Sequence, residues 1–293
     1  MSNSHEAADH SSIPTLRLGI VGGGRAAWAF GSSWNAVRGS LSGFVLRPES
    51  MSSLPELLKA PRLEAEELMA TSDVVLLAVS DTAIEQVGAS LSPLLRNDLA
   101  VFHASGSLSS EVLPLTPRRF SLHPLRALPP AGSRVSLSGA LLVAEGSDEG
   151  LATAHSLAAT LRGRMATIQA GQKPAYHAAA VFASNYVAVM LDIARRLMNA
   201  EGIDLPGLES ELGALAESAI GNWESQGGPE RFTGPASRGD LPVLKRHLAA
   251  LGPSSPLGRI YSALARELIS AENHSEAGSR AMDDLRKWLK ENG

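Results

Sequence analysis

The 293-residue sequence contains no cysteine. This absence excludes disulfide bonds, thiolate nucleophiles, thiolate metal ligands and iron–sulfur clusters from the chemistry of the protein. Basic residues do not outnumber acidic ones, and the formal net charge is -4. Without a basic excess, the sequence offers no field that would attract nucleic acid or an anionic membrane surface. We therefore expect neither of these partners, and we expect no metal site.

Long apolar runs are missing as well. The longest run, at 74–79, has the length of a strand, whereas a membrane span needs about 18 apolar residues. The first residues have neither a basic start nor an apolar stretch, so they do not resemble a secretory signal, and we expect a cytoplasmic location. Their polar composition predicts a disordered tail over residues 1–15.

Strand-sized apolar runs alternate with helical segments in the first part of the chain. Such an alternation is typical of a parallel sheet covered by helices on both faces. After Gly171, Ala, Val and Leu recur at three- and four-residue intervals, and we expect only helices there. The predicted fold is α/β: a Rossmann doubly wound parallel sheet over 16–171, then an all-helical C-terminal domain over 172–293. The expected strands are 16–21, 43–46, 73–79, 99–103, 119–122, 140–143 and 165–168.

A glycine-rich turn joins the first expected strand to the first expected helix. In the pattern G-x-G-x-x-A, the first glycine permits a tight turn, the second lets a pyrophosphate approach, and the final small residue permits close helix packing. The helix N-terminus adds a partial positive charge. The turn therefore predicts a dinucleotide site, with a purely structural turn as the alternative. The cofactor-binding candidates are Gly22, Gly23, Gly24, Arg25, Ala26 and Ala27.

The end of the second expected strand indicates which dinucleotide binds. An NAD site usually has an acidic residue there for the ribose 2′-hydroxyl, about 20 residues after the glycines. This sequence has Arg47 instead, which is able to pair with a 2′-phosphate. We therefore expect NADP(H) more than NAD. In the alternative, Arg47 is a solvated loop residue and Glu49 binds the ribose.

Polar residues follow the expected strand 73–79. Open parallel sheets bind their ligands at the carboxyl ends of the strands. Val79, Ser80 and Asp81 stand at such an end, so we expect them near the nicotinamide ribose. The favoured role of the Asp81 side chain is nevertheless an N-cap of the following helix.

Two further strands deliver polar groups to the same edge. His103 and Ser105 follow the strand 99–103, and His123 follows the strand 119–122. We expect His103 and Ser105 to contact the cofactor, and Ser105 and His123 to face the substrate. In the alternative, His103 is a strand-end residue bonded to the backbone.

Five stretches of the sequence carry a likeness to a known family: GIVGGGRAAWAF, HASGSLSSEVL, SLHPL, KPAYHAAAVFASNY and TGPASRGD. Through them the chain resembles, from about Leu16 onwards, the Rossmann-like proteins that carry a C-terminal DUF2520 domain. These are distant relatives of F420-dependent NADP oxidoreductases, pyrroline-5-carboxylate reductase and ketopantoate reductase. The resemblance implies an NADP-binding domain and a helical domain that pairs with a second copy, but it supplies no substrate. The stretch 123–127 departs from the more polar continuation expected there.

Hydride transfer to a carbonyl or imine needs a proton donor beside the reacting atom. Lys173, His177 and Ser184 lie at helical spacing on one stripe, with Asn185 on its flank. Lys173 and Ser184 would be roughly 16 Å apart, so we expect the centre near His177. Lys173, His177 and Asn185 are the catalytic candidates and Ser184 is a substrate contact, with a packed core role as the alternative for His177. Relatives that pair a Lys with an Asn four residues later do not match the wider spacing here.

A polar loop, TGPASRGD, precedes another expected helix. Arg238 is able to bind a substrate carboxylate with two hydrogen bonds. Asp240 is first a helix N-cap and only second a substrate contact. Asn222 is a further candidate for the same cleft, and a surface role is its alternative.

Together these features predict an NADP-dependent oxidoreductase that acts on a small carboxylated keto acid or imine. Arg238 would anchor the substrate, and His177 or Lys173 would donate the proton. The alternative is a non-catalytic dinucleotide-binding regulator or dimeric scaffold, and a deazaflavin partner is a weaker third hypothesis. Convergence of Lys173, His177, Asn185 and Arg238 in one cleft would favour catalysis.

Overall fold

The computed structural model describes residues 16–227, 231–272, 284 and 287–288, so the expected tail at 1–15 lies outside the described residues. The chain forms two compact units, Met1–Val187 and Ala188–Gly293. The sequence predicted a domain boundary at residue 172, but helix α6 (Lys173–Ala183) lies within the first unit. Lys173, the first residue of α6, is buried against the sheet of that unit.

The first unit is built on a seven-stranded sheet with the strand order β2-β1-β3-β4-β5-β6-β7. This order confirms the Rossmann-type fold, with one difference from the expected parallel sheet, because β6 runs antiparallel to β5. The segment between these two strands contains no helix, and an antiparallel neighbour needs no helical crossover. The strands are β1 (Arg17–Val21), β2 (Ser40–Val45), β3 (Val74–Leu77), β4 (Ala100–His103), β5 (Arg119–Pro124), β6 (Leu141–Gly146) and β7 (Arg164–Thr167).

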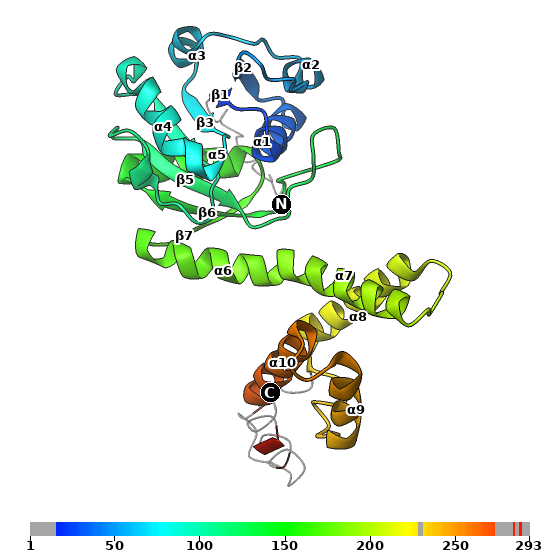
Figure 1. Cartoon of the computed structure of the whole chain (residues 1–293). Helices are drawn as coiled ribbons and strands as arrows, with labels where there is room; N and C mark the ends of the chain where they lie inside the picture. Colours follow the sequence, from blue (N-terminus) through cyan, green and yellow to red (C-terminus); the bar gives the residue numbers. More distant parts are fainter. Residues whose placement is uncertain (1–15, 228–230, 273–283, 285–286, 289–293) are drawn as a thin grey trace, which may run out of the picture. The chain divides into compact units, whose positions relative to one another are not determined.

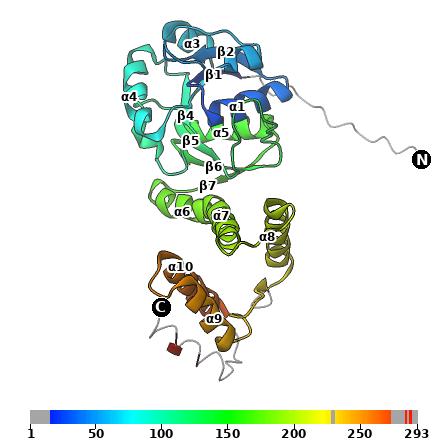
Figure 2. The same ribbon diagram turned by 45° about the vertical axis from the view of Figure 1, so that its right-hand side comes forward.

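Helices cover both faces of this sheet (Figures 1 and 2). Helices α1 (Arg25–Ala36) and α5 (Asp148–Thr160) pack on one face, and α3 (Ala65–Thr71) and α4 (Asp81–Leu91) pack on the other. Successive strand residues point to opposite faces, so Leu76 joins the core under α1 and α5. Its neighbour Leu77 joins the core under α3 and α4.

The core beneath α1 and α5 contains a row of aromatic rings. Phe102 and Phe120 stack with their centroids 4.9 Å apart, and Phe30 meets Phe102 edge to face at 5.5 Å. All three side chains are almost completely buried. Burying a phenylalanine contributes about 1.5–3 kcal/mol, so this row fixes α1, β4 and β5 relative to one another.

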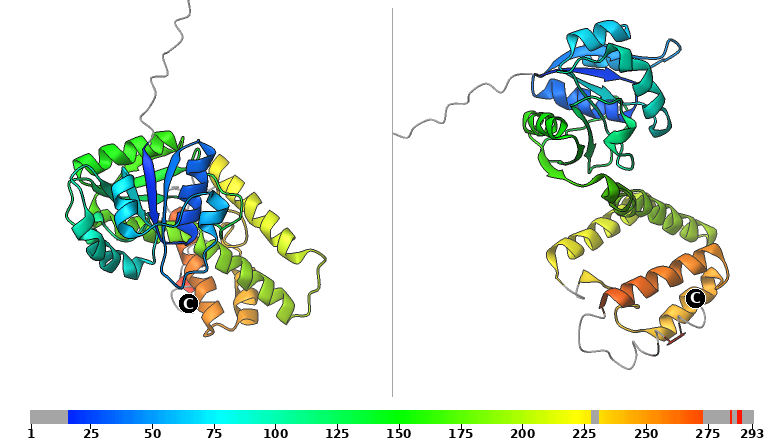
Figure 3. Two further views of the ribbon diagram at one scale, coloured as in Figure 1. Left: turned by 90° about the horizontal axis from the view of Figure 1, so that it is seen from above. Right: turned by 90° about the vertical axis from the view of Figure 1, so that its left-hand side faces the viewer.

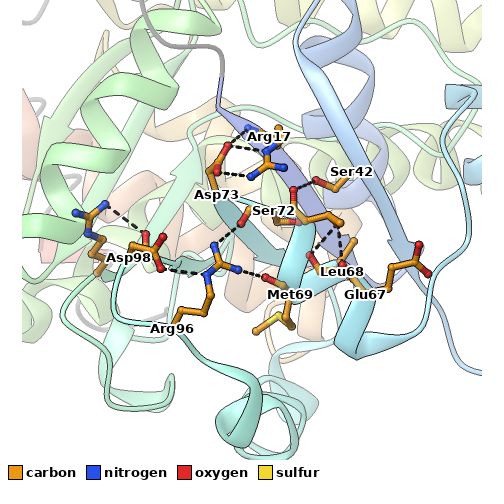
Figure 4. A network of polar contacts seen from close by, with 11 residues as sticks. Arg17, Ser42, Glu67, Leu68, Met69, Ser72, Asp73, Arg96 and Asp98 are labelled. Atoms are coloured by element: carbon orange, nitrogen blue, oxygen red, sulfur yellow. Dashed lines mark hydrogen bonds and ion pairs between the residues drawn. The ribbon is translucent and has the colours of Figure 1, made fainter.

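The amino-terminal end of the sheet carries an exposed polar network, which Figure 4 shows from close by. The Arg17 guanidinium pairs with the Asp73 carboxylate at 2.9 Å, which joins the start of β1 to the start of β3. Arg96 donates to the carbonyl oxygens of Met69 and Ser72. Exposed ion pairs stabilise a fold by less than about 1 kcal/mol, so the network aligns strand ends more than it stabilises them.

The described part of the second unit is helical, as expected. It contains most of α7 (Asn185–Ala200), together with α8 (Leu208–Ser225), α9 (Leu241–Leu251) and α10 (Pro256–Glu272), which Figure 3 shows in two further views. Helices α9 and α10 enclose a small core, whose buried members are Ala236, Leu244, Ala265 and Ile269.

One helical stretch, Ala170–Ala200, is long and apolar enough to cross a membrane by length and composition alone. Polar residues interrupt the stretch, so it contains no long unbroken apolar run. None of its most apolar window is buried inside the chain. Phe182, Tyr186 and Val189 are large apolar side chains that are exposed among the described residues of this stretch.

Candidate functional site

The turn after β1 has the geometry that the glycine pattern predicts. Gly22 has a φ of +111°, and a Cβ added there would lie 2.3 Å from the carbonyl oxygen of Ala78. Its amide donates to the Val45 carbonyl at 2.9 Å. Only glycine fits both the conformation and the space, so Gly22 is required by the fold itself.

Gly24 is different, because none of the described residues requires it to be glycine. It is the N-cap of α1 with a φ of -91°, and a Cβ added there would meet no closer atom than the Ala78 carbonyl oxygen, at 3.9 Å. Among the described residues, no side chain caps this helix, and its first turn contains no acidic residue. Open backbone and free N–H groups at a helix N-terminus suit a pyrophosphate.

The remaining residues of the turn pack as a helix start should. A Cβ on Gly23 would lie 2.6 Å from the Ser52 hydroxyl oxygen. Arg25 is exposed, Ala26 is half-buried and Ala27 is fully buried beneath the helix. The residues at this edge of the sheet therefore fit a dinucleotide.

Arg47 lies exposed in the loop after β2. Its guanidinium is 3.5 Å from the Glu49 carboxylate, and both side chains are mostly exposed, so the pair holds weakly. Arg62 holds the backbone of this loop, because its guanidinium donates to the carbonyl oxygen of Arg47 at 2.7 Å. Arg47 is thus free to turn toward an anion while its backbone stays in place.

Asp81 does not cap its helix, contrary to the expectation from sequence. The N-cap of α4 is Ser80, and Asp81 is the first helical residue. The Asp81 carboxylate instead accepts hydrogen bonds from the hydroxyls of Ser105 at 2.7 Å and Ser107 at 3.1 Å. The Asp81 carboxylate is therefore bonded to two hydroxyls of the loop after β4, and not to backbone N–H groups of α4. Val79, just before this cluster, is half-buried.

His103 is a buried structural residue, as the alternative interpretation held. Its Nδ1 accepts from the Ser105 amide at 3.2 Å, and its Nε2 lies 3.1 Å from the Ser109 carbonyl oxygen. Burial lowers the pKa of His103 to about 4, so the ring is neutral at physiological pH. Both nitrogens are used within the loop, which His103 shapes around Ser105.

Lys173 is buried in a polar network beneath the edge of the sheet. Its Nζ donates to the Ser121 hydroxyl at 2.8 Å and to the Ser105 carbonyl oxygen at 3.2 Å. Ser121 in turn donates to Glu145 at 3.2 Å, and Ser110 gives Glu145 two more hydrogen bonds. Burial lowers the pKa of Lys173 to about 8, while the carboxylates of Glu145 and Asp81 oppose that shift.

His123 meets α6 at the carboxyl edge of the sheet. It lies within β5 rather than after it, and its Nδ1 is 2.6 Å from the Tyr176 hydroxyl. The rings of His123 and His177 stand edge to face, with their centroids 6.0 Å apart. A Cβ on Gly106 would lie 2.5 Å from the His177 Nδ1 and 3.1 Å from the His123 Nε2.

Ser184 and Asn185 lie away from this cluster, at the point where α6 ends and α7 begins. Ser184 has a φ of -131° and interrupts the helical stripe. Its hydroxyl is bonded to the Ala180 carbonyl oxygen at 2.6 Å, and both Ser184 and Asn185 are exposed.

The three candidates of the second unit are described within that unit alone. Asp240 is the N-cap of α9, where its carboxylate accepts from the Val243 amide at 3.3 Å, which confirms its expected first role. Arg238 is exposed in the preceding loop, and Asn222 is exposed on α8.

Tyr176, Ser121, Ser110 and Glu145 are site residues that sequence reasoning missed. One signal was present: residues 121 and 123 alternate with the core residues 120 and 122, so they face the side of the sheet away from α1 and α5. The helix that packs on that side, α6, follows some fifty residues later. The sequence does not show that these two distant segments contact each other.

The comparisons with known proteins bear on both the family and the fold. Residues 140–268 match the model of the family described as a domain of unknown function, DUF2520, which confirms the resemblance over that part of the chain. The match begins at the start of β6, before the expected boundary. No curated protein matches the sequence.

Solved structures share the fold over most of the chain. A protein from Bacteroides fragilis assigned as an NADP oxidoreductase is 21% identical with a TM-score of 0.75, over 88% of this chain and 99% of its own. An imine reductase variant from Myxococcus stipitatus in complex with NAD+ is 15% identical with a TM-score of 0.57, over 92% and 99%. A reductive aminase from Aspergillus terreus in complex with NADPH and ethyl-5-oxohexanoate is 16% identical with a TM-score of 0.53, over 94% and 93%.

Proposed function

We propose that the protein is an NADP-dependent oxidoreductase that transfers a hydride to or from a small carboxylated keto acid or imine. The observation that carries the proposal is the open backbone at Gly24, the N-cap of α1, beside a turn that Gly22 holds tight. A bound nicotinamide would supply the hydride. The protein would bind the pyrophosphate through backbone N–H groups and hold the proton donor at the same edge of the sheet.

The fold relatives support this class of reaction. They include an imine reductase, a reductive aminase and a protein assigned as an NADP oxidoreductase. Reduction of an imine or a carbonyl needs the same parts, a hydride and a proton. The proposal keeps the cytoplasmic location expected from the sequence.

The candidate residues differ in how well their surroundings suit catalysis. Lys173 has its Nζ bonded inside the protein, so His177 is the better of the two proton donors first considered. Arg238 is exposed, and its guanidinium remains the proposed anchor for a substrate carboxylate.

Arg47→Asp is expected to reverse the choice of cofactor. The substitution replaces a cation with an anion at the proposed position of the 2′-phosphate, so affinity for NADPH should fall by about 100-fold, which corresponds to ~2.7 kcal/mol, and affinity for NADH should be retained. Fluorescence titration of wild type and variant with both coenzymes measures this directly.

Arg246→Asp, the same charge change on an exposed residue of α9, is the matched control and should leave both affinities unchanged. A wild type that binds neither coenzyme at micromolar concentration would rule out the proposed function. Binding of both coenzymes with unchanged affinities in Arg47→Asp would reject only the NADP preference.

A non-catalytic dinucleotide-binding regulator or scaffold is the second candidate. The observation in its favour is that Lys173 points into the protein while Asn185 is exposed at a helix break, so these two do not share a cleft. A protein that binds NADPH but oxidises it with no keto acid or cyclic imine would be of this kind.

We also propose that a second copy of the chain covers the exposed apolar side chains of the helices. These include Phe182 on α6, Val189 on α7, and Leu215 and Trp223 on α8, each about half exposed or more. Asp192 and its arginine partners interrupt the later part of the Ala170–Ala200 helix with charge, which suits a protein partner better than lipid. Covering each large apolar side chain contributes about 1.5–3 kcal/mol.

The double variant Phe182→Glu/Leu215→Glu is therefore expected to convert a dimer into a monomer, because it buries two charges in the proposed interface. Sedimentation at micromolar concentration measures the mass of each form. Ser210→Glu, on an exposed polar position of α8, is the control and should remain dimeric. A monomeric wild type, or one that floats with phosphatidylglycerol vesicles, would contradict the proposal.

A further inference from the structure

The pair formed by Tyr176 and His123 stands at the edge of the sheet where the proposed reaction would take place. His123 is near the carboxyl end of β5, and Tyr176 is in the first turn of α6. The Tyr176 hydroxyl lies 2.6 Å from the His123 Nδ1, and the two rings meet edge to face. Lys173, three residues before Tyr176, anchors this turn of α6 to the sheet.

The surroundings keep both members of the pair neutral. Burial, followed by the nearby charges of His177 and Lys173, lowers the pKa of His123 to about 4, and Asp81 on α4 opposes this shift. Burial raises the pKa of Tyr176 to about 12. A neutral imidazole has one nitrogen with a proton and one without, so it is able to accept a proton on one side and release one on the other.

The second nitrogen of His123 has a neighbour as well. Its Nε2 and the Nδ1 of His177 both lie within 3.1 Å of the point that a Cβ of Gly106 would occupy. Among the described residues, none forms a hydrogen bond with the His177 Nδ1, although that atom is buried. Gly106 therefore lets two imidazoles approach each other, and one of them has a buried nitrogen with unused hydrogen-bonding capacity.

Taking the proposed function as given, we propose that Tyr176 is the catalytic proton donor and that His123 and His177 relay the proton to it. In reduction, the substrate oxygen or nitrogen takes the proton of the Tyr176 hydroxyl as its carbon takes the hydride. Tyr176 regains a proton from the His123 Nδ1, and the His123 Nε2 accepts one from the side of His177. His177 replaces the proton it passes on with one from solvent, so the net reaction uses one solvent proton. Each histidine is then in its other neutral tautomer and regains the first by proton exchange with solvent before the next turnover.

Tyr176 fits this role better than the other candidates do. The Nζ of Lys173 is engaged by Ser121 and Ser105 in a buried site. His177 has its Nδ1 buried, which suits a relay behind the donor. Tyr176 is half-buried, and its hydroxyl contacts the His123 Nδ1, so it stands at the opposite end of the relay from His177.

The test is Tyr176→Phe, with NADPH oxidation by pyruvate and by pyrroline-2-carboxylate as probe reactions. Losing a positioned proton donor costs about 10²–10⁴-fold, so kcat should fall by at least 100-fold while the Kd for NADPH and the thermal unfolding temperature stay unchanged. The deuterium isotope effect with NADPH labelled at the transferred position should rise, because chemistry becomes rate-limiting. His123→Asn should lower kcat and raise the solvent isotope effect, because proton delivery to Tyr176 becomes rate-limiting.

Tyr261→Phe is the matched control, because Tyr261 makes the same kind of bond to His247 in the second unit, at 2.8 Å. It should leave kcat unchanged. Wild-type turnover with an equally active Tyr176→Phe would overturn the relay and leave the proposed function standing. A Tyr176→Phe variant that loses NADPH affinity along with kcat would also overturn it, since the pair would then shape the cofactor site. Absence of wild-type turnover with both probes would overturn the relay and the oxidoreductase proposal together.

Discussion

Gly24→Ala is expected to abolish NADPH binding without disturbing the fold. The backbone of Gly24 is in an extended conformation open to any residue, and a Cβ there would have 3.9 Å of clearance from the nearest atom of the protein. The added methyl would instead occupy the space where a pyrophosphate approaches the helix. We expect at least a 100-fold rise in Kd, or about 2.7 kcal/mol, measured by calorimetric titration, with an unchanged unfolding temperature.

The neighbouring glycine provides the contrast. Gly22→Ala places a Cβ 2.3 Å from the Ala78 carbonyl oxygen at a φ of +111°, so it should destabilise the fold as well as remove binding. If Gly24→Ala bound NADPH as tightly as the wild type, the turn would be a structural feature and no dinucleotide site. A Gly24→Ala variant that unfolded like Gly22→Ala would show that the turn has no free space.

Lys173→Met is expected to change how stability depends on pH. The unfolded chain holds the lysine proton up to about pH 10.5, whereas the folded protein releases it near pH 8. Between these values the unfolded state binds more protons, so the stability of the wild type should rise with pH relative to the variant. The gain should reach up to about 3 kcal/mol, measured by urea unfolding at pH 7.5 to 10.5.

Lys245→Met, at an exposed lysine of α9, reports the effect of removing any lysine and should not reproduce this gain. A constant difference between the wild type and Lys173→Met across the range would mean that the amine is solvated rather than buried. The same result would weaken the assignment of Lys173 as the anchor of α6.

Most of the helices and strands could be predicted because patterns of neighbouring residues indicate them. Each expected strand was found within a few residues of its place, since composition alone indicates buried runs such as 74–77. The direction of β6 could not be predicted in this way, because a buried strand has the same pattern whether it runs parallel or antiparallel. The domain boundary was expected where the helical pattern begins, and a helical pattern does not show which unit a helix packs against.

In the candidate site as well, features formed by consecutive residues could be predicted, and contacts between distant residues could not. The turn at Gly22 and Gly24 is formed by consecutive residues, so the sequence pattern contained all of it. The bond between His123 and Tyr176 joins residues 53 positions apart, and it depends on how a helix is seated on a strand. Asp81 was misjudged for the same reason, because its partners lie on another loop.

The reversed direction of β6 has an electrostatic consequence. If β6 ran parallel to β5, its last residues would lie at the carboxyl edge of the sheet. Glu145 would then stand among the residues proposed to bind a phosphate-bearing coenzyme. Because β6 runs antiparallel to β5, Glu145 pairs in register with Ser121, two residues before His123 on β5. The negative charge is held there by serines. One strand inversion thus keeps an acid inside the protein and off the surface that an anion has to approach.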